Sequence, residues 1–133
     1  MTAFSLTVRA YQVGASSWEE LPLTLHYQAS NPYEVTLSIG DEGVEWRLSR
    51  ELLQAGTAHP AGEGDVRLWP GRHTPTEQLF MHLSPPSGHA LLELPRTAVV
   101  EFLGTTECIV PTGTEDAGSF DAELRALLDG DPT

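Results

Sequence analysis

The strongest constraint on the fold of this chain is an alternation of apolar and polar residues through its first fifty positions. Phe4, Leu6 and Val8 are each separated by one polar residue, and the same spacing recurs after position 20. A period of two is expected of a β-strand that buries one face and exposes the other to water. The alternation predicts four consecutive strands near residues 4–10, 21–27, 33–39 and 44–48, and the short turns between them predict an antiparallel meander.

The rest of the chain predicts a mixture of helices and further strands. Ser49 is a favourable N-cap, so a short helix is expected from there to Gly56, with a loop over residues 57–64. Three more strands are expected at 65–69, 77–83 and 89–94, and a second helix from Pro95 to Gly104. A polar loop at 111–119 precedes a last helix over residues 120–130.

These elements predict a single α+β domain over residues 1–133. It is mainly an antiparallel sheet of about seven strands, with a short helix after the fourth strand and two C-terminal helices. A chain of this length buries enough apolar surface to fold without a disulfide or a metal.

The charge balance and the lengths of the apolar runs disfavour two classes of partner. Nineteen acidic residues stand against seven basic ones, all of them arginine, for a formal net charge of −12. Nucleic-acid binding is driven largely by cationic side chains that displace counterions from phosphates, so this chain is not expected to bind nucleic acid. It is not expected to insert into a membrane either, because no apolar run approaches the roughly twenty residues that a bilayer span needs.

The N-terminal residues bear on where the protein is located, and the single cysteine bears on whether it carries a reactive thiol. The first residues alternate like a strand and lack the pattern of a secretory signal, so a cytoplasmic protein is expected. Cys108 is the only cysteine and has no cationic neighbour in the sequence, and we interpret it as a small buried hydrophobe rather than a nucleophile.

No pattern in the chain predicts catalysis, a cofactor or a metal. The five histidines do not show the spacing of a zinc site, and the glycines form no phosphate-binding motif. Of the tryptophans, Trp46 is expected to pack on the core side of its strand, and Trp69 before Pro70 is expected to end a strand at a corner.

Several segments together resemble the SsgA-like family of septation and sporulation proteins from mycelial, spore-forming bacteria. The likeness runs from about Leu6 to Leu128. The segment ending in Trp69-Pro70 resembles the SsgB branch more than SsgA itself. The segments that carry the likeness are Asn31-Pro32-Tyr33, Val44-Glu45-Trp46 with Ser49-Arg50-Glu51-Leu52-Leu53, residues 62–70, residues 90–93, and residues 111–115.

The resemblance implies a non-enzymatic adaptor for cell division. Members of the SsgB branch are understood to recruit the tubulin-like GTPase FtsZ to future septum sites, where an SsgA-type paralogue places them. The family also implies a Whirly-like arrangement of two antiparallel sheets with helices, assembled as a homotrimer. The expected location is the cytoplasm, with recruitment to the division septum.

The surface expected to bind protein partners is the polar loop and the exposed face of the last helix, because loops on rigid scaffolds often carry binding. The residues assigned to it are Pro111, Gly113, Glu115, Asp121, Glu123 and Arg125. Gly113 is expected to let the loop turn sharply, and Glu115 to offer a charge to solvent. Two other functions stay open: a Whirly-like single-stranded nucleic-acid binder, and a non-catalytic domain that binds a small ligand.

Overall fold

The computed structural model describes residues 2–14, 18–41, 43–73, 76–84 and 89–116. In chain order its elements are β1 (Ala3–Val13), β2 (Trp18–Gln28), β3 (Glu34–Ile39), β4 (Val44–Ser49), α1 (Arg50–Ala58), β5 (Ala61–Glu63), β6 (Val66–His73), β7 (Thr76–Leu83), β8 (Ala90–Pro95) and α2 (Arg96–Ile109).

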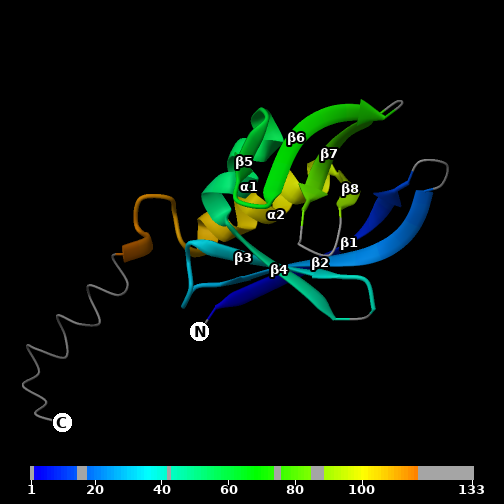
Figure 1. The fold of residues 1–133 in the computed structure, drawn as a ribbon. Helices are drawn as coiled ribbons and strands as arrows, with labels where there is room; N and C mark the ends of the chain where they lie inside the picture. Colours follow the sequence, from blue (N-terminus) through cyan, green and yellow to red (C-terminus); the bar gives the residue numbers. More distant parts are fainter. Residues whose placement is uncertain (1, 15–17, 42, 74–75, 85–88, 117–133) are drawn as a thin grey trace, which may run out of the picture.

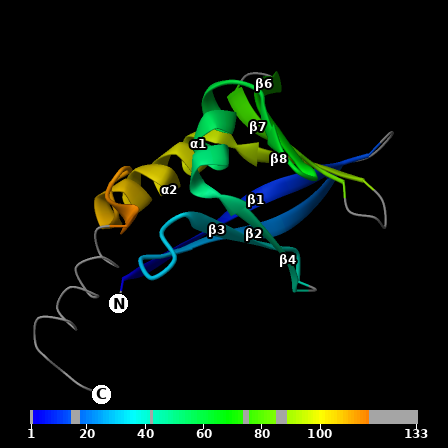
Figure 2. The ribbon, with the colours of Figure 1, turned by 60° about the vertical axis from the view of Figure 1, so that its left-hand side comes forward.

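All strand pairs are antiparallel, and the strand order is β4-β3-β2-β1-β8-β7-β6-β5. The order divides into a first half, β1–β4, and a second half, β5–β8. The halves meet where Tyr11 pairs with Glu93 and Gln12 with Leu92. Figures 1 and 2 show the two halves crossing each other, with both helices on the same side of the crossing.

The helices fill the space that the crossing leaves. α1 packs on β6, α2 packs on β1, β7 and β8, and the two helices contact each other. Phe4 of β1 stacks on Phe102 of α2 with their ring centroids 5.6 Å apart. The buried apolar residues of both halves and both helices form one core, which includes Leu25, Leu37, Leu53, Leu68, Met81, Leu94 and Phe102.

The predicted fold class is confirmed: an antiparallel sheet dominates, and a short helix follows the fourth strand. The count of about seven strands is one too low, because β5 lies inside residues 57–64, which were predicted to be a loop. Three residues are too few to show a period. The helix predicted at 120–130 lies outside the described residues.

Both helices continue past the glycines that were predicted to end them. Gly56 is buried inside α1, and a Cβ built there would lie 2.5 Å from the Cβ of Leu68. Glycine therefore lets α1 approach β6 closely. Gly104 is exposed inside α2, where nothing lies within 4 Å of such a Cβ, and the helix runs on to Ile109. In α2 the buried neighbours Leu103 and Thr106 keep the chain helical on both sides of Gly104, so packing of the helix outweighs the low helix propensity of glycine.

Trp69 does not end a strand, contrary to the prediction. β6 continues through Pro70 to His73, and Pro70 pairs with Leu79 of β7. Proline lacks the amide donor, so it is tolerated where one side of a strand carries no neighbour. The pairing of β5 with β6 ends at Leu68, which leaves that side of the strand open at Pro70.

The prediction that Cys108 is buried was also wrong, because its side chain is exposed. α2 buries Val99, Phe102, Leu103 and Thr106, which share one face of the helix. Position 108 falls on the opposite face. Trp46, by contrast, packs against the core as predicted.

The described ranges contain neither a membrane-spanning helix nor a cluster of metal-binding side chains. No helix there has both the length and the apolar character needed to cross a bilayer. No three His, Cys, Asp or Glu side chains in those ranges gather where a metal could bind.

Candidate functional site

Arg50, the first residue of α1, is the centre of a polar cluster beneath the surface. Ser49 caps the helix by accepting a hydrogen bond from the amide of Leu52 at 3.0 Å. The Arg50 side chain, which is 2% exposed, runs from there to the end of α2. Its Nη1 donates to the carbonyls of Thr106 at 3.2 Å and Val110 at 2.7 Å. The last carbonyls of a helix lack partners within it and carry negative partial charge, so a cation from α1 caps α2.

Two carboxylates and an aromatic ring complete the surroundings of the guanidinium. Nη2 donates to Glu115 Oε2 at 3.0 Å, and Glu107 Oε2 lies 3.8 Å from Nη1. The guanidinium carbon sits 5.2 Å from the centroid of the Tyr27 ring. A buried charge needs such partners, because leaving it unpaired out of water is strongly unfavourable.

Residues 111–116, which we call the 111–116 loop, are held from the inside by this cluster. Gly113 has a φ of +93°, a left-handed conformation that glycine adopts without strain, and its amide donates to Glu115 Oε1 at 2.7 Å. Glu107 accepts hydrogen bonds from the amide and the hydroxyl of Thr112 and, at 3.0 Å, from Gln54 Nε2. The outer side of residues 111–114 remains exposed. The loop is therefore exposed on its outer side and held on its inner side by the buried Arg50.

The hydrogen bonds of the cluster move the pKa values of its carboxyls downward. For Glu107 the main cause is the hydroxyl of Thr112, with Arg50 acting in the same direction. For Glu115 the main cause is its own backbone amide, and the hydrogen bond from Arg50 adds to it, so its pKa is lowered too. Both residues are therefore anionic at neutral pH.

The turn Asn31-Pro32-Tyr33 is tied to the same cluster. Tyr27 donates its hydroxyl to the carbonyl of Pro32 at 2.9 Å, and the amide of Arg50 donates to the carbonyl of Tyr33 at 2.7 Å. The Tyr33 side chain is 51% exposed, and its hydrogen bond with Asp116 raises the pKa of its hydroxyl to about 12. The turn and the loop thus form one continuous surface.

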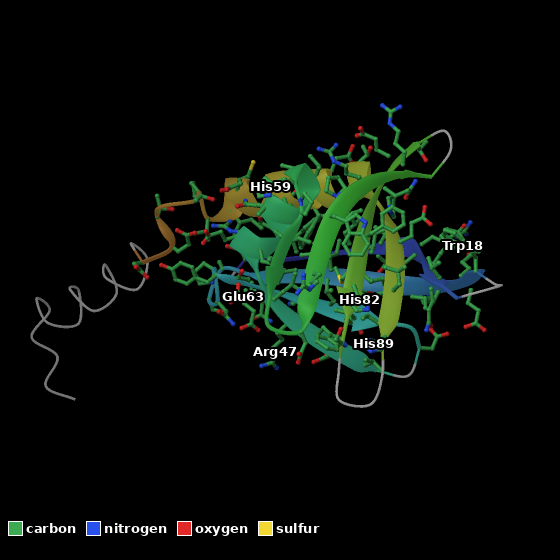
Figure 3. All side chains as sticks on the ribbon, turned by 45° about the horizontal axis from the view of Figure 1, so that its top comes forward. Trp18, Arg47, His59, Glu63, His82 and His89 are labelled. Carbon is green, nitrogen blue, oxygen red and sulfur yellow. The ribbon has the colours of Figure 1, made fainter. Side chains whose placement is uncertain are left out.

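Beside this surface lies a groove of about 410 Å³, which we call the edge groove. Its floor consists of Leu48, Leu52 and Val66, each at most 7% exposed. Around the floor lie residues of the turn, of β3 and β4, and of the connection between β5 and β6. They are Asn31, Tyr33, Glu34, Arg47, Ser49, Glu63 and Gly64. Figure 3 shows Arg47 and Glu63 on the same face, and Arg47 pairs with Glu34 at 3.6 Å.

The residues predicted to bind partners divide into three groups. Pro111 and Gly113 are exposed on the 111–116 loop, as expected of a contact surface. Glu115 does not offer its charge to solvent as predicted, because its side chain is 12% exposed and is bound to Arg50. The remaining residues, Asp121, Glu123 and Arg125, lie outside the described part of the chain.

Sequence reasoning missed the central role of Arg50, although one signal was available. A cation in the first turn of a helix is unfavourable beside the positive end of the helix dipole. An arginine directly after an N-cap serine therefore indicates that its charge is used elsewhere, here at the end of α2.

Four of the five segments that carry the family likeness converge at this end of the molecule. The turn 31–33, the β4–α1 junction and the start of the 62–70 segment line the edge groove, and residues 111–115 adjoin it through Arg50 and Tyr33. The fifth segment, residues 90–93, lies in β8.

The sequence is similar to those of known sporulation and cell division proteins. Residues 21–115 match the family described as Streptomyces sporulation and cell division protein, SsgA. The sporulation-specific cell division protein SsgB of Frankia casuarinae is 42% identical over 113 residues, which cover 82% of this chain and 79% of that protein. SsgB of Streptomyces coelicolor is 41% identical over 120 residues, which cover 87% and 88% of the two chains.

Solved structures show the same likeness. One solved structure superposes on this chain with a TM-score of 0.83 at 38% identity. It is described by the words "Mutations in SsgB correlate to longitudinal cell division during sporulation of Streptomyces coelicolor". It covers 87% of this chain and 94% of that one. The SsgA-like sporulation-specific cell division protein of Thermobifida fusca gives a TM-score of 0.84 at 34% identity, with 92% and 93% covered.

Proposed function

The chain belongs to the SsgA family of sporulation and cell division proteins, and we propose that it is a non-enzymatic adaptor that recruits or positions FtsZ at sporulation septum sites. The observation that supports the proposal most is the convergence of four family-like segments on one exposed end of the molecule. Those segments bring together an anchored loop, an exposed tyrosine and a groove rather than a constellation of catalytic groups. Such a surface is suited to binding another protein.

The 111–116 loop is the proposed contact, together with Asp121, Glu123 and Arg125 of the following segment. In this proposal Pro111 and Gly113 contact the partner. Glu115 holds the loop through Arg50 instead of reaching the partner itself. An SsgA-type paralogue is the second proposed partner, and the septum is the proposed place of action.

A capture experiment with purified FtsZ tests this function. The immobilised chain should retain FtsZ, and Pro111→Glu combined with Asp121→Arg and Glu123→Arg should reduce the retained amount at least about fivefold, which is roughly 1 kcal/mol. Glu101→Arg is the control, since Glu101 is exposed on α2. Failure of the unaltered chain to retain FtsZ would overturn the proposed partner, and full retention by the triple variant would place the contact elsewhere.

We also propose that the chain assembles as a homotrimer. In the described ranges β5 is an edge strand of the sheet, and exposed strand edges are commonly covered by association. Light scattering at micromolar concentration should give about three times the monomer mass of 14.5 kDa. A mass equal to that of the monomer would contradict the trimer.

A further inference from the structure

The edge groove follows the backbone of an edge strand rather than one face of the sheet. Arg47, Leu48 and Ser49 are consecutive residues of β4, and all three line it. Successive side chains of a strand point to opposite faces, so a hollow that touches three in a row runs along the edge of the strand. Within the described ranges β4 pairs with β3 alone, and its other edge faces this hollow.

The opposite wall of the groove comes from the other end of the strand order. Glu63 ends β5, and Gly64 leads from it into Val66 of β6. Because β4 and β5 are the first and last strands of the sheet, the groove lies between its two edges. It is the opening that an incompletely closed sheet leaves.

The shape of this opening suits an extended peptide. Three residues of β4, Arg47 to Ser49, line the groove, which is about 10 Å at roughly 3.3 Å per residue, so about three residues of a peptide can pair with β4 inside it. Leu48, Leu52 and Val66 form an apolar floor for inward-pointing side chains. The volume of about 410 Å³ lies within the range of about 300 to 1,000 Å³ that is usual for binding pockets.

Tyr33 gives the groove a wall that is already in place. Its side chain is 51% exposed, and its backbone carbonyl accepts a hydrogen bond from the Arg50 amide. An aromatic side chain has few rotatable bonds, so it loses little conformational freedom when a partner packs on it. Tyrosine is enriched among the strong contact points of protein interfaces.

The charges around the groove select the kind of segment. Glu34 and Glu63 line it, and the cation that lines it among the described residues, Arg47, already pairs with Glu34. The exposed Glu51 and Asp65 are next in sequence to the lining residues Leu52 and Val66. The whole chain carries a net charge of −12. A cationic segment is attracted to this end, whereas an acidic one is repelled.

We propose that the edge groove binds an extended segment of a partner protein in which basic and apolar side chains alternate, added as an extra strand along β4. Its backbone pairs with the free edge of β4, its apolar side chains cover Leu48, Leu52 and Val66, and its basic side chains meet Glu63. This is strand addition, in which backbone hydrogen bonds supply affinity and side-chain pockets supply specificity. The proposal deepens the adaptor function by naming the recognition mode.

Three fluorescent probe peptides of eight residues test the inference by polarisation. The first alternates Lys or Arg with Val, the second alternates Glu with Val, and the third repeats the first with N-methyl groups on alternate amides. The first should bind saturably and more weakly as salt rises, because salt screens exposed charges. The second should not bind, and the third should bind at least about tenfold more weakly, since it has lost strand-pairing donors.

Single substitutions then locate the bound peptide. Glu63→Arg reverses an exposed charge in the groove and should weaken the basic peptide about tenfold, while Glu101→Arg on α2 should leave it within about twofold. Tyr33→Ala should also weaken it, and its circular dichroism spectrum checks that it folds. Equal affinity for both Glu→Arg variants, equal binding of the acidic peptide, or no binding of the basic peptide would each refute the groove as its site.

Two further measurements separate this inference from its alternatives. If Glu63→Arg and Tyr33→Ala change the oligomeric mass, the groove is covered by a second copy of the chain, and the inference is wrong. FtsZ capture by the same variants distinguishes the two proposals. If FtsZ is retained equally by all variants while the peptide is lost, the adaptor function stands but the groove serves another protein. If peptide binding behaves as expected and FtsZ is not captured at all, the groove stands and the proposed partner falls.

Discussion

Replacement of Arg50 by methionine should destabilise the chain far more than the same replacement at Arg47. Methionine keeps most of the apolar stem of Arg50 but removes the hydrogen bonds to the carbonyls of Thr106 and Val110 and to Glu115. Hydrogen bonds that involve a charged group contribute about 1.5 to 3 kcal/mol each, but removing a buried guanidinium also recovers a desolvation cost of several kcal/mol. The expected net loss is about 2 to 4 kcal/mol.

Arg47 provides a matched control three residues earlier in the chain. Its side chain is 70% exposed and lies 3.6 Å from Glu34, and exposed ion pairs are usually worth at most about 1 kcal/mol. Arg47→Met is therefore expected to change stability by less than about 0.5 kcal/mol.

Urea unfolding followed by tryptophan fluorescence measures both variants. With a slope near 2 kcal/mol per molar urea, Arg50→Met should lower the midpoint by about 1 to 2 M, while Arg47→Met should leave it nearly unchanged. Midpoints for the two variants within about 0.3 M of each other would refute the view that a buried arginine joins α1 to the end of α2.

Three more expectations follow from particular sites. Gly56→Ala should cost about 1 to 3 kcal/mol, because its Cβ would meet Leu68 at 2.5 Å, whereas Gly104→Ala, which has open space around it, should stabilise by about 0.5 to 1 kcal/mol; urea midpoints that shift alike would contradict this. The folded-state pKa of Glu115 lies below its ordinary 4.5, so its contribution to stability is present above that pH and is lost as the pH falls through the folded pKa; urea midpoints between pH 6 and 3 should therefore fall less in Arg50→Met than in the unaltered chain. Cys108 should react with a thiol-specific chromogenic reagent without denaturant, and protection of the native thiol would contradict its exposure.

The elements of this fold were predictable where a local pattern reports burial directly. Apolar and polar residues alternate in the first four strands because one face of each strand contacts the core. The N-cap residue Ser49 predicts the start of α1. The prediction failed at glycines and at Pro70, whose effects depend on neighbours distant in sequence. Gly56 is kept in α1 by contact with β6, and Pro70 is tolerated because one side of β6 is open at that point.

The candidate site was less predictable than the fold, since its parts are far apart in the sequence. Composition and turn residues indicated a polar loop at 111–119 with a turn at Gly113, but Glu115 was predicted to be a solvent-exposed charge. Its partner, Arg50, is 65 positions away, and only the packing of α1 against α2 brings the two together. The edge groove depends on the curling of the sheet, which brings its first and last strands to one opening. This curling does not change the alternation of apolar and polar residues in either strand, so the sequence pattern could not predict the groove.

The pairing that joins the two halves of the sheet is confined to one end of β1. In the described residues it consists of the pairs Tyr11–Glu93 and Gln12–Leu92. The helices add contacts to both halves, because α1 packs on β4 and β6 and α2 packs on β1 and β7. Arg50 joins the first turn of α1 to the end of α2. A side chain beneath the surface therefore fixes the two helices that connect the halves to each other.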